Sequence, residues 1–255
     1  MKEVRFERIM EILKRRGYAT VDEIAKELGI SKITVRRDLS FLESQGLVER
    51  RRGGALLKNF HREIPFFMKL DRRKNQKIRV AKEAVKLLNS GDVIFASGGT
   101  TVYYTVQEIS RSDVSDITIM TNSITTAWAV INSQKPISLI HTGGSVREGS
   151  FECVGAQVMS FVERTNADVF LIGVNGIDLE KGISFDNYEE SLIAQKMIEN
   201  SSKVIVVSDS SKLGKVSPYK VSDLDGVDFL VIDDSEKSRK IKKVVENMGV
   251  KVILA

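Results

Sequence analysis

The sequence has very little cysteine and histidine: Cys153, His61 and His141 are the only ones. A single cysteine excludes a disulfide within the chain and a zinc site built on cysteines. The two histidines lack partners at the spacing of metal ligands, so we expect no metal site. No apolar run approaches the roughly 18 residues of a membrane span, and residues 1–17 are charged throughout, unlike a signal peptide. We therefore expect a soluble cytoplasmic protein.

Two glycine-rich patterns for binding nucleotides are also missing. The sequence contains neither a Walker A loop nor the G-x-G-x-x-G fingerprint. Gly214 and Lys215 lack the upstream glycine and the following Ser or Thr that a P-loop needs. ATP and NAD are therefore not indicated, and we expect no cofactor.

The charge that is present is unevenly distributed. The 255 residues are enough for a small domain plus a medium one, or for one large α/β unit. Residues 1–80 hold 21 Lys and Arg against 11 Asp and Glu, whereas residues 81–255 hold 18 against 23. A basic first third favours a polyanionic partner, although a basic face without any partner would have the same composition.

Apolar spacing predicts two helices before residue 30. The first spans residues 1–16 and ends at Gly17. The second begins after Thr20, which forms a capping-box pattern with Glu23. The residues that we expect to be buried are Val4, Ile9, Ile12 and Leu13 in the first helix, and Val21, Ile24, Ala25 and Leu28 in the second.

A third helix is predicted from its cap at Ser31 to about Ser44. Val35, Leu39 and Leu42 share the side that should face the core. The other side and its flanks carry Lys32, Ile33, Thr34, Arg36, Arg37 and Ser40. In a helix-turn-helix, the N-terminal part of the second helix reaches base edges in the major groove. This basic helix is therefore a candidate reader of DNA.

A β-hairpin is predicted over residues 47–57, with its turn at Gly53-Gly54. Its arginines would lie near the DNA backbone, since Arg binds phosphate as well as guanine. The candidate DNA-binding residues are Ser31, Lys32, Thr34, Arg36, Arg37, Arg50, Arg51 and Arg52. Three short helices with a basic third helix could also form a protein-binding bundle.

A family resemblance covers this part of the chain, from Met1 to about Leu57. The stretch "VDEIAKELGISKITVRRDLSFLESQGLVERRRGGALL" resembles the N-terminal domain of the DeoR family of bacterial transcription regulators. The matching features are "S..TVRRDL..LE..G" and the "R.GGA" that follows. The resemblance implies a winged helix-turn-helix DNA-binding domain over residues 1–57.

The rest of the chain alternates strands with helices. Residues 58–75, which include Pro65 and a charged run, are expected to be a linker. A helix is predicted over residues 76–89. The predicted strands are 92–96, 117–120, 137–140, 168–172, 203–207, 228–232 and 251–254. Continuous apolar strands with helical crossovers predict a mainly parallel α/β sheet covered on both faces, over residues 76–255.

Polar, glycine-rich segments follow five of these strands and should meet at the carboxyl edge of the sheet, where open α/β sheets bind ligands. They are "SGGTT" (97–101), "TNS" (121–123), "HTGG" (141–144), "GVNGID" (173–178) and "SDSSK" (208–212). Gly98 and Gly99 allow close approach of a ligand, and a helix opening at Thr100 points free N–H groups at an anion, with Thr101 adding a donor. A tight strand-to-helix turn would need glycine in any case.

Other residues in these segments have a functional and an ordinary interpretation. Lys212 could supply a cation or be solvated. Asp178 and Asp209 could bind sugar hydroxyls or cap turns. Glu189 and Glu190 open a helix, where acids favour the helix dipole. Trp128 and Cys153 are expected to be packing residues.

This second part resembles the sensor domain of the same DeoR family, which is similar in fold to ribose-5-phosphate isomerase. The matching segments are "GDVIFASGGTT", "TNS", "GG", "DVFLIGVNGI" and "DSSKLG". The resemblance implies a phosphorylated sugar effector, with Gly99, Thr100 and Thr101 at the phosphate and Asn122, Glu190 and Lys212 around the rest. One departure is Ala194, where the family usually has a basic residue; Lys196 lies two positions further on.

Three classes of function remain open. The first is a metabolite-responsive repressor, a homo-oligomer that binds operator DNA and a phosphosugar. The second is a sugar-phosphate isomerase fused to a DNA-binding head, with Asp178 or Glu190 as the base. The third is a protein-interaction scaffold, which the arginine-rich helix and hairpin disfavour. The sequence names neither the effector nor the operon, and it leaves dimer and tetramer open.

Overall fold

The computed structural model describes residues 2–57 and 66–255, and the chain divides into two compact units, residues 1–72 and 73–255. Residues 58–65 of the expected linker, with Pro65, lie outside the described residues, as does His61. The remainder of the expected linker is partly helical: residues 66–70 form one helix, and a second begins at Lys74.

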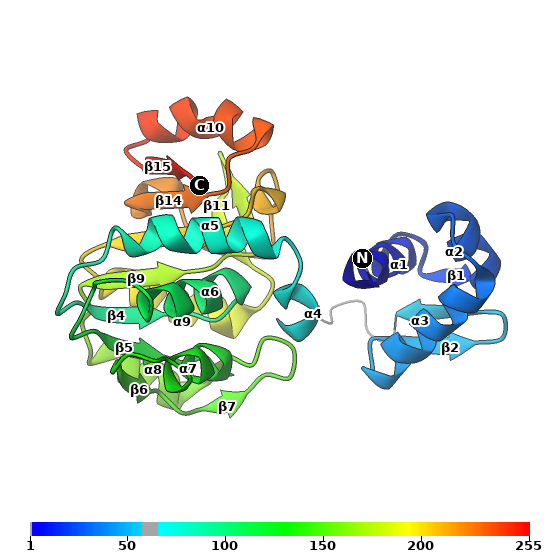
Figure 1. Ribbon diagram of the computed structural model, residues 1–255, viewed down its shortest axis with the longest axis horizontal. Coiled ribbons are helices and arrows are strands. Elements are labelled where there is room, and N and C mark those ends of the chain that lie inside the picture. The colour runs from blue at the N-terminus through cyan, green and yellow to red at the C-terminus, as the bar shows by residue number, and fades with distance from the viewer. Residues whose placement is uncertain (1, 58–65) are drawn as a thin grey trace. The chain divides into compact units, whose positions relative to one another are not determined.

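The first unit contains the three predicted helices and the predicted hairpin (Figure 1). Its elements are α1 (Lys2–Arg16), β1 (Tyr18–Thr20), α2 (Val21–Leu28), α3 (Lys32–Ser44), β2 (Val48–Arg51), β3 (Gly54–Leu57) and α4 (Phe66–Leu70). Strand β1 was not predicted. It pairs antiparallel with β3, so the hairpin becomes a three-stranded sheet of order β1-β3-β2.

Local signals in the sequence explain where these helices begin and end. Thr20 and Glu23 form the predicted capping box on α2, and Ser31 Oγ accepts a hydrogen bond from the N–H of Thr34 at the start of α3. Val35 and its neighbours Leu39 and Leu42 are fully buried, as predicted. The predicted burial of Val4 is wrong.

Val4 is 51% exposed because the buried face of α1 is centred elsewhere. Phe6, Ile9 and Leu13 form that face, and Val4 lies five residues from Ile9, roughly 140° around the helix axis. Phe6 also stacks on Phe41 of α3, with ring centroids 4.9 Å apart. The buried residues of α1 are therefore those that face the rest of the unit, including α3, and an apolar side chain elsewhere on the helix stays exposed.

The turn of the hairpin lies one residue earlier than predicted. Arg51 pairs with Gly54, which leaves Arg52 and Gly53 as the two loop residues. Gly53 has a φ of 81°, a left-handed conformation that glycine adopts without strain. Gly54 is needed for space, because a Cβ there would come within 2.3 Å of the carbonyl oxygen of Ala19 on β1.

The second unit is built on a seven-stranded, wholly parallel sheet, which confirms the predicted fold class. Every predicted strand is present within one residue of its expected bounds. The strands are β4 (Val93–Ala96), β5 (Thr118–Thr121), β6 (Ser138–His141), β9 (Val169–Ile172), β12 (Val204–Ser208), β14 (Phe229–Ile232) and β15 (Lys251–Leu254). Their order is β15-β14-β12-β9-β4-β5-β6.

Helices cover both faces of this sheet, because successive residues of each strand point to opposite sides. Phe95 and Phe170 belong to one core cluster, whereas Ile94 and Leu171 belong to the other. The helices are α5 (Lys74–Val85), α6 (Thr100–Ile109), α7 (Ile124–Ile131), α8 (Ala156–Glu163), α9 (Tyr188–Glu199) and α10 (Glu236–Asn247). Residues of α5, α6 and α7 pack on one face, and residues of α8, α9 and α10 pack on the other.

Short elements that were not predicted cover part of the second face. A two-stranded ribbon joins β7 (Ser145–Val146) to β8 (Cys153–Val154). An antiparallel sheet of order β10-β11-β13 contains β10 (Gly176–Asp178), β11 (Gly182–Phe185) and β13 (Tyr219–Ser222), and there are two single turns, η1 (Ser210–Lys212) and η2 (Leu224–Gly226). The apolar residues of the small sheet, such as Ile177 and Phe185, are buried against α9 and the main sheet.

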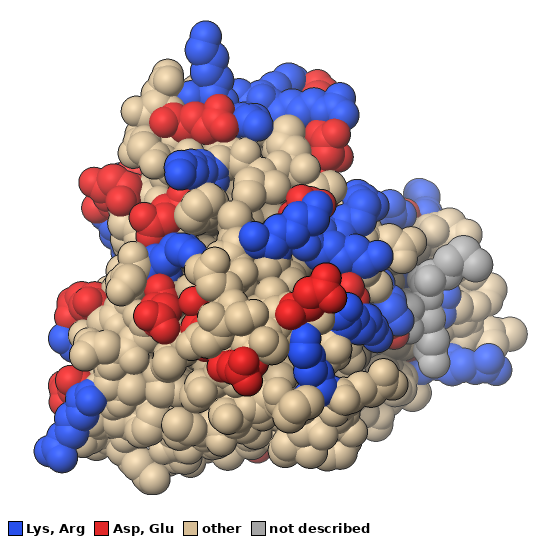
Figure 2. Space-filling view, turned by 60° about the vertical axis from the view of Figure 1, so that its left-hand side comes forward, with Lys and Arg blue, Asp and Glu red and all other residues tan. Residues whose placement is uncertain are grey.

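The surface of the second unit differs from one region to another. Charges of both signs are mixed over α10 at the top of Figure 2, where Arg239 pairs with Asp234 and Lys240 with Glu236.

Cys153 is buried, as predicted, whereas the predicted burial of Trp128 is wrong: Trp128, on α7, is 59% exposed. No helix among the described residues is both long and apolar enough to cross a membrane.

The strand order places the switch point of the sheet between β4 and β9. From β4 the chain runs outward through β5 to β6, then returns to add β9 on the other side of β4. The crossovers that leave β4 and β9 therefore go in opposite directions. Open α/β sheets bind ligands at the carboxyl ends of the strands at such a point.

Candidate functional site

The exposed side of α3 carries the predicted DNA-reading residues. Arg36 and Arg37 are exposed and form no ion pair within the described part of the chain. Lys32 is exposed as well, and its Nζ lies 2.9 Å from Asp22 Oδ2 on α2. Ile33 is 70% exposed beside them, an apolar side chain that the prediction had left out of the site.

Ser31 and Thr34 form the N-terminal end of this face. The two hydroxyl oxygens lie 2.8 Å apart, and Ser31 caps the helix. Asp38, on the inner side of α3, is buried and receives a hydrogen bond of 2.8 Å from Arg5 on α1. This ion pair fixes the helix from behind, so the basic side remains turned to solvent.

The hairpin of β2 and β3 is the wing of this unit, and its three arginines have different surroundings. Arg50 Nη1 donates a hydrogen bond of 2.8 Å to Ser40 Oγ, which ties the wing to α3. Arg51 pairs with Glu49 on its own strand at 2.6 Å. Arg52 lies in the turn, where its carbonyl accepts a hydrogen bond from the hydroxyl of Tyr18. All three side chains are exposed at one end of the first unit's sheet.

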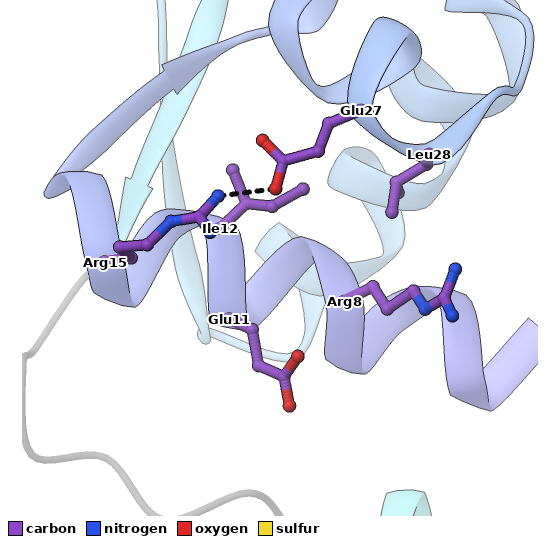
Figure 3. A pocket seen from close by; sticks show the side chains of 6 residues that line it. All are labelled: Arg8, Glu11, Ile12, Arg15, Glu27 and Leu28. Atoms are coloured by element: carbon purple, nitrogen blue, oxygen red, sulfur yellow. Dashed lines mark hydrogen bonds and ion pairs between the residues drawn. The ribbon is translucent and has the colours of Figure 1, made fainter.

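A pocket of about 330 Å³ lies between α1 and α2 of the first unit (Figure 3). It is lined by Arg8, Glu11, Ile12, Arg15, Glu27 and Leu28. Arg15 and Arg16 both donate hydrogen bonds to the Glu27 carboxylate, so that charge is satisfied within the protein. None of the predicted site residues lines this pocket.

In the second unit, the segment "SGGTT" forms the turn from β4 into α6 at the switch point. Gly99 is the N-cap of α6 with a φ of 103°, a conformation that favours glycine. Thr100 and Thr101 occupy the first two helical positions, each 8% exposed. Neither hydroxyl has a hydrogen-bond partner among the residues that the structure describes. The turn thus presents N–H groups of a helix N-terminus and two hydroxyls, an arrangement suited to an anion.

Hydrogen bonds hold this turn against β9 and β5. Ser97 Oγ accepts the N–H of Gly173, which follows β9, at 3.1 Å. Thr126 Oγ1 on α7 donates to the carbonyl of Ser97 at 2.9 Å, and Thr121 Oγ1 donates to the carbonyl of Ala96. The carboxyl ends of β4, β5 and β9 are therefore brought together, as their polar segments predicted.

Asn122, at the end of β5, is 1% exposed. Its Nδ2 donates to the carbonyl of Cys153 at 2.9 Å, which fixes the orientation of the amide. Its Oδ1 has no hydrogen-bond partner among the described residues. A buried acceptor without a partner costs about 1–3 kcal/mol, so this oxygen is suited to receive a donor from a ligand.

Glu152 is a site residue that the prediction missed. It reaches the switch point on the ribbon between β7 and β8, and its Oε2 lies 3.5 Å from Asn122 Nδ2. A Cβ at residue 98 would come within 2.4 Å of Glu152 Oε1, so Gly98 leaves the room that this carboxylate occupies. Burial raises the pKa of the Cys153 thiol, and the adjacent Glu152 adds to the increase. No local pattern in the sequence could place residue 152 beside residue 98.

Glu190 is buried and holds this ribbon in place. Its Oε1 accepts hydrogen bonds from Arg147 and, at 2.6 Å, from Ser150 Oγ. The N–H of Glu190 is capped by Asn187 Oδ1 at the start of α9. Glu190 therefore frames the site by binding the segment that carries Glu152, whereas Glu189 beside it is exposed.

Lys212 follows β12, which is separated from β4 by β9 alone, a distance of about 10 Å between strands. It lies next to Asp209, whose carboxylate is approached by Arg73 Nη1 at 3.7 Å. Burial would raise the pKa of Asp209, but hydrogen bonds from Ser211 and the charges of Lys212 and Arg73 hold it below its usual value. Two cations are thus assembled at this edge, of which the prediction named only Lys212.

Two parts of the predicted site have a role in the local fold. Asp178 ends β10, and its Oδ1 accepts the N–H groups of Glu180 and Lys181, so it caps a hairpin turn. The segment "HTGG" leads into β7, and a Cβ at Gly144 would come within 2.6 Å of Val158. Asp178 therefore caps a turn, one of the two roles expected for it, and "HTGG" connects the carboxyl end of β6 to β7.

These features define a class of protein. A helix-turn-helix unit with a basic reading helix and wing is joined to a parallel α/β unit with an anion-binding turn at its switch point. The first unit is suited to duplex DNA, and the second is suited to a small polar ligand. The combination is that of a DNA-binding protein that responds to a ligand.

Comparison with known proteins gives the family. Residues 5–59 match the DeoR-like helix-turn-helix domain, and residues 72–234 match the DeoR C terminal sensor domain. The "HTH-type transcriptional regulator GlpR" of Haloferax volcanii is 34% identical over 96% of this chain and 95% of that protein. The chain belongs to the DeoR family and is a DNA-binding transcriptional regulator.

Further similarities extend to other proteins. The "Glycerol-3-phosphate regulon repressor" of Escherichia coli is 27% identical over 88% of each chain. Among solved structures, the ribose 5-phosphate isomerase of Plasmodium falciparum aligns with a TM-score of 0.40 and 21% identity, over 54% of this chain and 52% of that chain.

The departure from the family pattern at Ala194 has a local explanation. Ala194 is 2% exposed within the core cluster between α9 and the main sheet. Lys196 lies two residues further along α9 and pairs with Glu199. Position 194 is therefore a packing position in this chain.

Proposed function

We propose that this protein is a repressor of a carbohydrate-metabolism operon and that a phosphorylated sugar controls its binding to the operator. The observation that carries the proposal is the turn at Gly99, Thr100 and Thr101 beside the buried, unpartnered Oδ1 of Asn122. The turn binds the phosphate through N–H groups and hydroxyls, and Asn122 accepts a hydrogen bond from a sugar hydroxyl.

The charges around the turn support a dianionic ligand. Lys212 and Arg73 lie at the same edge of the sheet and share the carboxylate of Asp209. Glu152 lies on the other side, against Gly98, where a carboxylate is an acceptor for sugar hydroxyls. In this assignment Gly98 allows Glu152 to approach, and Glu190 positions the ribbon through Arg147 and Ser150.

For DNA, the proposed reading face is the exposed side of α3 and the phosphate contacts are on the wing. Lys32, Arg36 and Arg37 lie where a recognition helix meets base edges, with Ser31 and Thr34 near the backbone. Ile33 is placed to contact a thymine methyl group. Arg50, Arg51 and Arg52 bind adjacent phosphates. Operator DNA and phosphorylated metabolites are cytoplasmic, so we place the regulator there, as a homo-oligomer.

The test compares phosphorylated sugars with their unphosphorylated forms by calorimetry. Ribose 5-phosphate, glucose 6-phosphate and related esters are titrated into the protein, each paired with its parent sugar. A charge-assisted hydrogen bond contributes about 1.5–3 kcal/mol, so the parent of any ester that binds should bind at least about a hundredfold more weakly.

Two variants test where the phosphate lies. Thr100→Val removes a hydroxyl with little change of shape, and Lys212→Met removes a charge with little change of length. Each should weaken the phosphosugar strongly and leave ligand-free operator binding intact. Equal affinity for ester and parent sugar, or full phosphosugar affinity in both variants, would show that the site recognises something other than phosphate at this turn.

We propose further that the second unit turns over no sugar phosphate. An isomerase would need a carboxylate base at the sugar carbons. Of the two carboxylates that the sequence offered as this base, Asp178 is occupied at its hairpin turn and Glu190 is bound by Arg147 and Ser150. The third carboxylate, Glu152, is assigned in this proposal to hydrogen bonds with sugar hydroxyls. Incubation with pentose and hexose phosphates, followed by product analysis, tests this; steady turnover that is lost in Glu190→Gln would establish the isomerase instead.

A further inference from the structure

The outer side of α7 exposes an apolar stripe. Ile124, Trp128 and Ile131 are spaced four and three residues apart, so they lie on one side of the helix. Their exposed fractions are 40%, 59% and 66%. Ala129 and Val130, between them in sequence, pack on the sheet. The helix thus buries one apolar side within the unit and presents a second one to solvent.

No residue of α7 is charged: its sequence is "ITTAWAVI". The exposed helix α10 is different, because it carries ion pairs such as Lys240 with Glu236. In Figure 2, the lower part of the view, at the level of α7, β6 and β7 in Figure 1, shows few charged side chains. A partner recognised through charge would find none on α7, whereas a second copy of the same uncharged stripe is complementary to it.

The area of the stripe fits the centre of a protein interface. The three side chains expose on the order of 350 Å², within the range of the largest apolar patches on soluble monomers. Each partner in a standard interface buries roughly 800 Å², of which somewhat more than half is apolar. Two such stripes facing each other would supply the apolar core of one interface, with polar neighbours as its rim.

We propose that α7 is the contact through which two copies of this chain associate about a two-fold axis. The stripe is nearly symmetric about Trp128, with one isoleucine four residues before it and one three residues after it. When two copies of α7 pack antiparallel, Trp128 meets its own counterpart at the axis, and Ile124 of one copy meets Ile131 of the other. Each copy then uses the same surface, as an isologous interface requires.

This contact adjoins the proposed effector site. Ser123 caps α7, and Asn122 immediately precedes that cap. A ligand bound at Asn122 would act on the N-terminal end of the contact helix. This coupling rests on the proposed function, whereas the contact itself does not.

The first experiment measures self-association of the full chain by analytical ultracentrifugation. Ile131→Lys should raise the dissociation constant of the dimer by about a hundredfold or more, because it places a charge against Ile124 of the other copy, within the apolar core of the interface. Val244→Lys is the matched control: it alters an exposed apolar residue outside the stripe, 43% exposed on α10, and should leave association unchanged. Since Ile131 is exposed, its replacement should leave the fold intact, which circular dichroism verifies.

The second experiment tests the antiparallel register. Ile124→Asp should weaken association as Ile131→Lys does. The double variant should associate about tenfold or more tightly than either single variant, because the introduced carboxylate of one copy would face the introduced ammonium group of the other. Within one helix these positions are seven residues apart, roughly 10 Å along the axis, so the rescue must come from contact between copies.

Trp128 supplies an independent signal, since it is the only tryptophan in the sequence. Its fluorescence should shift to longer wavelength when the wild type is diluted through the dissociation constant, and should be red-shifted at all concentrations in Ile131→Lys. Association of Ile131→Lys as tight as that of the wild type, a wild type that stays monomeric at high concentration, or no rescue in the double variant would overturn the proposal.

Discussion

Arg37 and Arg51 both contribute positive charge to the DNA-binding unit, but their surroundings differ. Arg37 is exposed on α3 without an ion pair among the described residues, and Arg51 pairs with Glu49 on the wing. We expect Arg37→Ala to weaken operator binding by about 1–3 kcal/mol and to relax base preference, because a groove contact is lost. Arg51→Ala should weaken binding to all sequences evenly and reduce the salt slope by about one.

Mobility-shift titrations at several salt concentrations, with operator and random duplex, measure both effects. Arg164→Ala is the control, because it removes an exposed arginine from the end of α8 in the second unit. If Arg37→Ala leaves both the affinity for the operator and the base preference unchanged, Arg37 on α3 does not contact base edges in the major groove.

The ion pair between Arg5 and Asp38 is a partly buried electrostatic contact between α1 and α3. The Asp38 side chain is fully buried and Arg5 is 26% exposed. Asp38→Ala leaves the guanidinium without its partner, so we expect a loss of about 3 kcal/mol in the stability of the first unit. Hydrogen exchange of the α1 and α3 amides in the full chain measures it.

An exposed ion pair provides the comparison. Asp234 pairs with Arg239 at the surface, where solvent screens the interaction, and its replacement by alanine should have little effect on stability. Equal protection of α1 in wild type and Asp38→Ala would mean that the Arg5 pair contributes no net stability.

At the scale of elements, the position of the wing depends on β1. Gly54 pairs with Thr20, and a Cβ at residue 54 would meet backbone and side-chain atoms of Ala19 and Tyr18. We expect Gly54→Ala to destabilise the three-stranded sheet by about 2 kcal/mol and to weaken DNA binding, because the backbone must shift to admit the methyl group.

Gly53→Asn is the matched control for this prediction. Nothing lies within 4 Å of a Cβ at residue 53, and asparagine tolerates the left-handed conformation. Hydrogen exchange in residues 18–20 and 54–57 should change in Gly54→Ala and remain near wild type in Gly53→Asn. The opposite ranking would mean that the turn, and not the approach of β1, fixes the wing.

The elements that sequence reasoning missed are those without a local signal. Strand β1 has three residues, and β10 lies in a segment that resembles a loop because it is rich in glycine and asparagine. Both are strands only because another segment pairs with them: β3 in one case and β11 in the other. Continuous apolar strands and capped helices carry their own signal, which is why the seven strands of the main sheet were predicted to within one residue.

At the scale of the whole molecule, we expect the two units to be separable. The boundary between the two compact units lies between Arg72 and Arg73. A fragment that begins at Arg73 retains the seven-stranded sheet, α7 and the proposed effector site. It should fold, self-associate and bind the phosphosugar with the affinity of the full chain, because no predicted effector residue precedes Arg73.

Calorimetry and sedimentation of this fragment check the expectation, with the full chain as reference. A soluble, folded fragment that neither associates nor binds the effector would count against a sensor that works independently of the head. An insoluble fragment would count against the boundary at residue 73.

The sequence by itself determined the DeoR family, the helix-turn-helix unit, the parallel sheet and the turn at Gly99, because periodicity, caps and glycine turns act over a few residues. The tertiary structure decided what depends on distant segments. It placed Glu152 against Gly98, bound Glu190 to Arg147, used Asp178 to cap a turn and left Trp128 in solvent. Which side of a residue is covered is set by strand order and crossovers, and these are fixed only when the whole chain packs.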